Sequence, residues 1–255
     1  FSTDSKTNQG RRYLEIQGGL LWNIAGGSTS HADHKEVIAF AMRMKGGAIR
    51  NLAFGCSRAN NSNGSRAFVV TGGEIYGWIT PGSNGTKDYG GILEGYGYLY
   101  FGGNASIDAK KHLKGSSTVL NHSVGGNLFG AGCGISSTNT SGGNTLGTNT
   151  VVADNAYVQR GVYAGGSYGY CDATAYVYVT GGHVDAEDGG VGGNNQTTYV
   201  SMPNGVFGGS CQNKGNESKI YMTGGTVDGG IYGGSNQNGT MSGNTNIKMV
   251  GGKVD

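Results

Sequence analysis

Apolar residues recur two and four positions before a series of glycine doublets along the chain, with small or polar residues between them. This alternation has the period of two that is typical of a β-strand with one buried face. The pairs are Leu14 and Ile16 before Gly18, Met42 and Met44 before Gly46, Phe68 and Val70 before Gly72, Tyr98 and Tyr100 before Gly102, Val177 and Val179 before Gly181, Ile220 and Met222 before Gly224, and Ile247 and Met249 before Gly251. We expect these pairs to be the inward residues of equivalent strands.

A second short strand is predicted directly after each doublet, because the second residue after it is again apolar. These residues are Leu21, Ile49, Ile75, Leu128, Val184, Val227 and Val254. A third strand follows, as in Gly161-Val162-Tyr163 and Ile231-Tyr232, and it leads into a loop rich in Asn, Ser and Gly. A helix-like pattern at residues 33–45 is better explained as a strand over 39–45, because Met42 and Met44 fit the strand register.

The doublets define a repeat, since Gly18, Gly46, Gly72 and Gly102 follow one another at spacings of 28, 26 and 30 residues. The stretches 125–181 and 181–224 are interpreted as two repeats each, with degenerate corners at 158–161 and 202–205. The expected fold is all-β: a single domain over 1–255 that forms a right-handed parallel β-helix (β-solenoid) of about ten coils, with three short strands per coil.

The 53 glycines among 255 residues now have a geometric reason. A corner that stacks on an identical corner needs positive φ and no Cβ, and glycine provides both. The net charge of +2 gives no electrostatic case for a nucleic acid partner, and no apolar run is long enough for membrane insertion.

The repeat in residues 220–254, read as strand, Gly-Gly, x-Val and Ile-Tyr-Gly-Gly-Ser, resembles the glycine-doublet repeats of microbial cell-surface adhesins and extracellular fibre proteins. The resemblance implies a structural or adhesive β-solenoid, located outside the cell or on its surface, that acts as the shaft of an adhesin or the subunit of a fibre. Glycans or a host surface are the partners that it implies.

Both ends of the chain read as parts of the repeat, with Phe1-Ser-Thr-Asp at the start and Gly251-Gly-Lys-Val-Asp at the finish. The chain is therefore expected to be either a segment of a longer repeat array or a subunit that stacks head to tail on copies of itself.

Asn-x-Ser/Thr triplets are more frequent than the composition predicts. They form either Asn-Gly turns or N-glycosylation sites on a secreted rod. The candidate asparagines are Asn60, Asn63, Asn84, Asn104, Asn121, Asn139, Asn195, Asn216 and Asn238.

The sequence predicts that all four cysteines follow a glycine of a third strand, and no Cys-x-x-Cys motif is present. They are Cys56, Cys133, Cys171 and Cys211. Cys133 and Cys171 are the candidates for a disulfide between neighbouring coils. Such cysteine usage favours an oxidising, extracellular setting.

Asp185, Asp228 and Asp255 occupy equivalent positions after His183-Val, Thr226-Val and Lys253-Val. Stacked carboxylates could coordinate calcium, with Glu187 and Asp188 nearby, or could be solvated outward side chains. No other cofactor is expected.

An enzyme is not expected, because acidic residues are few. The alternative is a polysaccharide lyase or glycoside hydrolase on a parallel β-helix, which would use the group Asp185, Glu187 and Asp188. The motif His31-x-x-His34 and the basic cluster at 110–114 are interpreted as surface features. The exposed aromatics Tyr96, Tyr168 and Tyr170 could stack on sugar rings or on one another.

Overall fold

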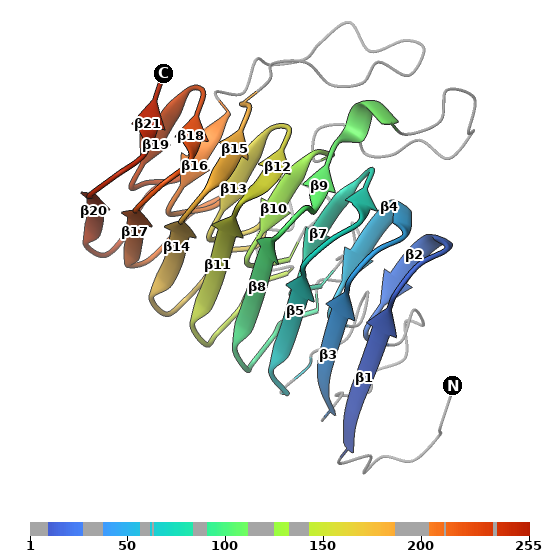
Figure 1. Ribbon diagram of the computed structural model, residues 1–255. Helices are drawn as coiled ribbons and strands as arrows, with labels where there is room; N and C mark the ends of the chain where they lie inside the picture. The colour runs from blue at the N-terminus through green and yellow to red at the C-terminus, as the bar shows by residue number, and fades with distance from the viewer. Residues whose placement is uncertain are drawn as a thin grey trace, which may run out of the picture.

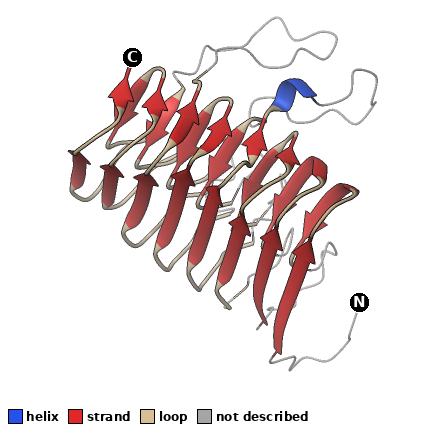
Figure 2. Cartoon of the chain, viewed as in Figure 1, coloured by secondary structure: helices blue, strands red, loops and turns tan. Residues whose placement is uncertain are grey.

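The computed structural model of the chain describes residues 10–27, 38–56, 62, 64–83, 91–111, 125–132, 143–186, 204–211, 213–236 and 239–255. In these residues the fold is all-β, with parallel strands arranged in two sheets and one short 3-10 helix, η1 (Ala109–Lys111). Figure 2 shows the strands stacked side by side and the single helical turn at their margin.

The first sheet has eight strands, and each strand pairs in parallel with its equivalent in the next repeat. In order along the sheet they are β1 (Gly10–Ile16), β3 (Ile38–Met44), β5 (Arg66–Val70), β8 (Gly97–Gly102), β11 (Asn149–Asp154), β14 (Ala175–Val179), β17 (Ser218–Met222) and β20 (Thr245–Met249). β1 lies at one end of the molecule and β20 at the other (Figure 1). Strand β3 confirms the strand that was expected over 39–45.

We call the stack of strands in the first sheet the first column. The second sheet has thirteen strands in two further stacks, the second and third columns, which meet in the long strand β4 (Ala48–Phe54). β4 pairs with β6 through Ala48 and Ile49, and with β7 through residues 52–54. The second column continues through β6 (Glu74–Ile75), β9 (Ser106–Ile107), β12 (Ala156–Val158), β15 (Gly182–Val184), β18 (Thr226–Val227) and β21 (Lys253–Val254). The third column continues through β7 (Trp78–Thr80), β10 (Asn127–Phe129), β13 (Gly161–Tyr163), β16 (Gly205–Phe207) and β19 (Gly230–Tyr232), while β2 (Leu20–Ala25) pairs with β4.

The core lies between these columns and consists of the inward residues of every repeat. Ile220, Met222 and Val227 are fully buried, as the alternation predicted, and Ile231 packs against them from the third column. Aromatic rings of the third column stack from repeat to repeat: Phe129, Tyr163 and Phe207 are buried, and Tyr232 at the end of the stack is 43% exposed. Cross-repeat aromatic stacking therefore occurs mainly in the interior.

The register of β8 differs by one residue from the sequence prediction. Leu99 and Phe101 are fully buried, whereas Tyr98 is 37% exposed and Tyr100 also faces outward. A shift of one residue moves every side chain of a strand to the opposite face. Phe101 pairs with Val70, and the doublet Gly102-Gly103 follows Phe101 directly, whereas Thr71 separates Val70 from its doublet. The corner to β9 is one residue longer than the corner to β6, because Ser106 pairs with Glu74.

In the residues that the structure describes, the first sheet holds eight strands, against the expectation of about ten coils. Residues 181–224 hold one repeat, because Gly205 begins the third-column strand β16. Leu128 likewise belongs to β10 of the third column, and Asn155, with φ 50°, occupies the corner between β11 and β12.

Candidate metal site and outer-face clusters

Three aspartates follow the paired valines of β15, β18 and β21, as the sequence predicted. Val184 pairs with Val227, and Val227 pairs with Val254, so the residue after each valine lies at the same height in its repeat. The amide N–H of Asp228 donates to the carbonyl oxygen of Val184 at 2.9 Å. The amide of Asp255 donates to Val227 in the same way at 3.0 Å.

The side-chain cluster is formed by His183, Asp185 and Asp228, and it does not include Asp255. One potential ligand atom from each of these three residues lies within 4.8 Å of the other two. His183 Nε2 is 2.7 Å from Asp228 Oδ2. The carboxylate of Asp255 instead accepts a hydrogen bond from Lys253 Nζ at 2.5 Å. Asp255 thus lies apart from this group, and a lysine stands in its repeat where β15 has a histidine. Calcium coordination by the three aspartates stays a prediction.

Tyr157, in the repeat that precedes that of His183, contacts the carboxylate of Asp185. It pairs with His183 in the second column, and its hydroxyl donates to Asp185 Oδ2 at 2.6 Å. The rings of Tyr157 and His183 meet edge to face with centroids 6.1 Å apart. The cluster thus comes from two neighbouring repeats, and Tyr157 contacts it from a third. Its side chains are only half-buried, at 42% exposure for His183 and 39% for Asp228.

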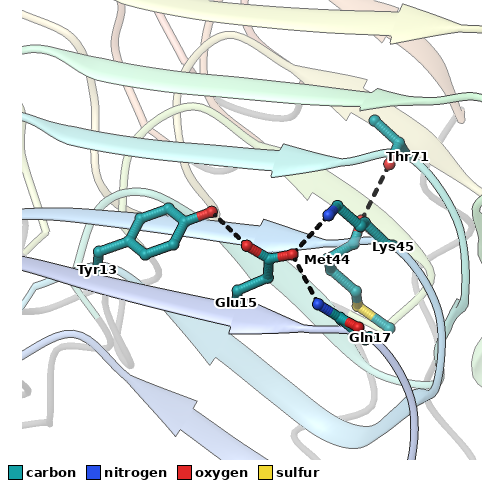
Figure 3. Close-up of polar contacts among 6 residues, drawn as sticks. All are labelled: Tyr13, Glu15, Gln17, Met44, Lys45 and Thr71. Atoms are coloured by element: carbon teal, nitrogen blue, oxygen red, sulfur yellow. Dashed lines mark hydrogen bonds and ion pairs between the residues drawn. The ribbon is translucent and has the colours of Figure 1, made fainter.

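A second polar cluster lies on the outer face of the first sheet around Glu15 (Figure 3). Its carboxylate accepts hydrogen bonds from Tyr13 Oη and Gln17 Nε2 at 3.0 Å each and from Lys45 Nζ at 2.5 Å. Lys45 and the other two donors lower the pKa of Glu15 to about 2. Thr71 of the next repeat donates to the carbonyl oxygen of Met44 at 3.3 Å. These contacts join neighbouring repeats from the outside.

Tyrosines continue the outer face along the first sheet. Tyr100 donates to Asp154 Oδ2 at 2.5 Å, and this hydrogen bond lowers the pKa of Asp154 while it raises that of Tyr100. Tyr178 stacks on Tyr221 of the next repeat, with ring centroids 5.2 Å apart. Tyr96 and Tyr170, which the sequence singled out for stacking, lie outside the strands of the first sheet. Tyr96 is 63% exposed, and Tyr170 carries the ammonium group of Lys214 4.4 Å above its ring.

Two of the candidate glycosylation sites belong to the described residues. Asn104 is exposed at the corner between β8 and β9. Asn216 precedes β17, and its side-chain amide donates to the carbonyl oxygen of Asp172 at 2.6 Å. Asn60, Asn63, Asn84, Asn121, Asn139, Asn195 and Asn238 lie outside the described residues.

Cys171 occupies a different column from the one that the sequence predicted. It pairs with Thr145 in a short run of β-bridges and does not follow a third-column glycine. It is a free, buried cysteine whose sulfur contacts the carbonyl oxygens of Gly147 and Ala173. Burial raises the pKa of its thiol to about 11. Cys133, its expected disulfide partner, lies outside the described residues.

Several other sequence candidates also fall outside the described residues. They are His31, His34, Glu187, Asp188, and the basic residues His112 and Lys114. Of the acidic group expected for a glycan-cleaving enzyme, the structure therefore places only Asp185.

No protein-family model matches the chain, and no curated protein or solved structure matches it. Among the described residues, no helix has the length and apolar character needed to cross a lipid bilayer.

Proposed function

We propose that the chain forms a right-handed parallel β-solenoid with an extracellular structural or adhesive role, as the shaft of a surface adhesin or the subunit of a fibre. One observation carries this proposal: equivalent strands of all repeats pair in parallel from β1 to β20 without a break in the first sheet. A chain that returns to the same sheet in every repeat winds as a coil, and such crossovers are right-handed in nearly all proteins.

The distribution of side chains supports a structural role. Seven steps of about 4.8 Å between the eight stacked strands give a rod of roughly 34 Å. Its interior is filled by apolar side chains, and its outer face is joined from repeat to repeat by polar and aromatic contacts such as Glu15 with Lys45 and Tyr178 with Tyr221. A rod of this kind can hold a binding domain away from a cell surface or link subunits of a fibre.

The end repeats support assembly with further copies of the chain. Ile247 and Met249 of β20 are 46% and 47% exposed, whereas their equivalents Ile220 and Met222 in the preceding repeat are fully buried. At the opposite end, Leu20 and Trp22 of β2 are 53% and 41% exposed. An edge strand with unpaired backbone groups and apolar inward residues is a template for another strand. We propose that a second copy stacks head to tail, so that its β1 continues the sheet after β20.

Sedimentation velocity over a range of concentrations, with electron microscopy of the same samples, tests this assembly. We expect linear species that grow with concentration. The double variant Ile247→Lys/Met249→Lys should remain monomeric, because it places two ammonium groups on the inward face of the edge. Ile247→Lys alone should already weaken association, and Asn246→Lys is its matched control, since it adds one ammonium group on the outward face of β20 and should still associate. A wild-type chain that is monomeric at every concentration would overturn the stacking.

The extracellular location is tested by N-glycan occupancy after secretion from a host that glycosylates asparagine. Asn104 is exposed and should carry a glycan, whereas Asn216 should remain unmodified while its amide is bonded to Asp172. Peptide mass spectrometry measures both occupancies. Equal, negligible occupancy at all triplets would favour their interpretation as turns.

A further inference from the structure

The cluster of His183, Asp185 and Asp228 brings together one imidazole and two carboxylates from neighbouring repeats. It is the group of three potential metal ligands found in the described part of the chain. His183 and Asp185 are two residues apart at the end of β15 and therefore project from the same face. Asp228 lies one repeat further on, and its carboxylate reaches back to the imidazole at 2.7 Å. The arrangement is thus produced by stacking and not by a local motif.

The nitrogen donor decides the class of ion. Calcium prefers six to eight oxygen ligands, and this cluster replaces one of the expected oxygens with an imidazole nitrogen. Zinc binds histidine nitrogen and carboxylate oxygen together, in four-coordinate sites that often have three protein ligands. Asp255, which would extend an all-oxygen site, is bonded to the ammonium group of Lys253. The donor set therefore fits Zn²⁺ better than Ca²⁺.

The distances require only a local adjustment. Ligand atoms in a tetrahedral zinc site lie roughly 3.4 Å apart, given bond lengths of about 2.0–2.2 Å. The three donor atoms are now within 4.8 Å of one another, and the contact between His183 and Asp228 is shorter than the ligand separation. Both side chains are about 40% exposed, so they can rotate around an ion without displacing the core. The exposed side leaves room for a water molecule as the fourth ligand.

Tyr157 has the position of a residue that orients a metal ligand. Its hydroxyl donates to Asp185 Oδ2 at 2.6 Å, and the same carboxylate supplies one of the three potential ligand atoms. Hydrogen bonds of this kind fix the orientation of ligating side chains, and their loss typically weakens metal binding by about 10–100-fold.

We propose that His183, Asp185 and Asp228 form a Zn²⁺ site that joins the repeat of β15 to the repeat of β18, with Tyr157 positioning Asp185. Metal binding at a site that exists only in the folded protein stabilises the fold. The bound ion therefore links two neighbouring repeats beside the second column and stabilises their contact.

Isothermal titration of the metal-free chain with Zn²⁺ alone, and separately with Ca²⁺ alone, tests the proposal. The wild type should bind one equivalent of Zn²⁺ at this site and bind Ca²⁺ at least about tenfold more weakly. His183→Ala and Asp228→Asn should each weaken Zn²⁺ binding at least tenfold, and Tyr157→Phe should weaken it by about tenfold. Zn²⁺ should also raise the Tm of the wild type, and this shift should be absent in His183→Ala.

Two matched controls make the test specific. Asp255→Asn changes the equivalent aspartate outside the cluster and should bind Zn²⁺ like the wild type. His31→Ala/His34→Ala removes the two histidines of the His-x-x-His motif and should also leave this binding unchanged. Circular dichroism checks that each variant is folded. The proposal is overturned if the wild type does not bind Zn²⁺, if His183→Ala binds it equally well, or if only the control variants lose it.

Discussion

Glu15 is the residue whose ionisation the structure perturbs most clearly on the outer face. Its pKa falls from 4.5 to about 2 because Lys45, Tyr13 and Gln17 all stabilise the carboxylate. A folded-state pKa below the unfolded value adds stability at higher pH. The contribution of Glu15 should therefore be fully present above pH 4.5 and be lost as the pH falls toward 2.

Urea unfolding of the wild type and of Glu15→Gln at several pH values measures this contribution. The wild type should be more stable at pH 7, and the two curves should converge near pH 2. Lys45→Met provides a control, because it removes the first cause of the shift and should bring the Glu15 midpoint in an NMR titration back toward 4.5. A wild-type midpoint near 4.5 would contradict the contact geometry.

At the scale of the element, the corners depend on glycines whose backbone no other residue adopts readily. Gly225 has φ +82°, and a Cβ built on it would lie 2.8 Å from the carbonyl carbon of Gly181 in the neighbouring corner. Gly225→Ala should therefore lower the free energy of unfolding by about 1–3 kcal/mol.

Gly234 is the matched control in the same repeat. Its φ is not in the left-handed region, and the nearest atom to a Cβ there is 3.7 Å away. Gly234→Ala should be neutral or stabilise the protein by up to about 1 kcal/mol, because it reduces the freedom of the unfolded chain. Chemical denaturation measures both changes, and equal effects at the two positions would mean that stacked corners do not impose the glycine requirement.

The interior aromatic column should contribute more to stability than the exterior one. Phe207 is buried and stacks on Tyr163 and Tyr232, with both centroid distances at 4.8 Å. Phe207→Ala should cost about 3–5 kcal/mol, because it leaves a cavity in addition to removing the stacking. Tyr178 stacks on Tyr221 on the outer face, and Tyr178→Ala should lose only about 0.5–1.5 kcal/mol. Comparable losses in thermal unfolding would indicate that the outer aromatics are equally important.

At the scale of the whole molecule, stability should decrease toward the edges of the sheets. Each repeat contacts only its neighbours, so an end repeat loses the contacts of one side. The strand β20 is exposed along its whole length, whereas alternate residues of β11 are buried between two repeats. Hydrogen exchange of the dilute chain should therefore be fast in β20 and slow in β11.

The same measurement at high concentration links exchange to assembly. If copies stack head to tail, protection of β20 should increase with concentration while that of β11 remains constant. Uniform exchange across the repeats would contradict the decrease toward the edges, because it would mean that the molecule opens only as a whole.

The sequence predicted the inward face of most strands of the first sheet, because alternation and glycine conformation are local properties of the chain. It also predicted that the aspartates of three repeats occupy equivalent positions. It did not predict the register of β8, where Phe101 faces inward and Tyr100 faces outward. Small differences in corner length are invisible to a pattern that is anchored on the doublets.

The sequence by itself thus determined a repeated, alternating β architecture with glycine corners. Only the tertiary structure decided which residues of different repeats touch, as with His183 and Asp228, or Cys171 and Thr145. The physical reason is that strand propensity and turn geometry act over a few residues. Contacts between repeats, in contrast, depend on where each insertion returns the chain to the stack, and the number of residues in between does not fix that position.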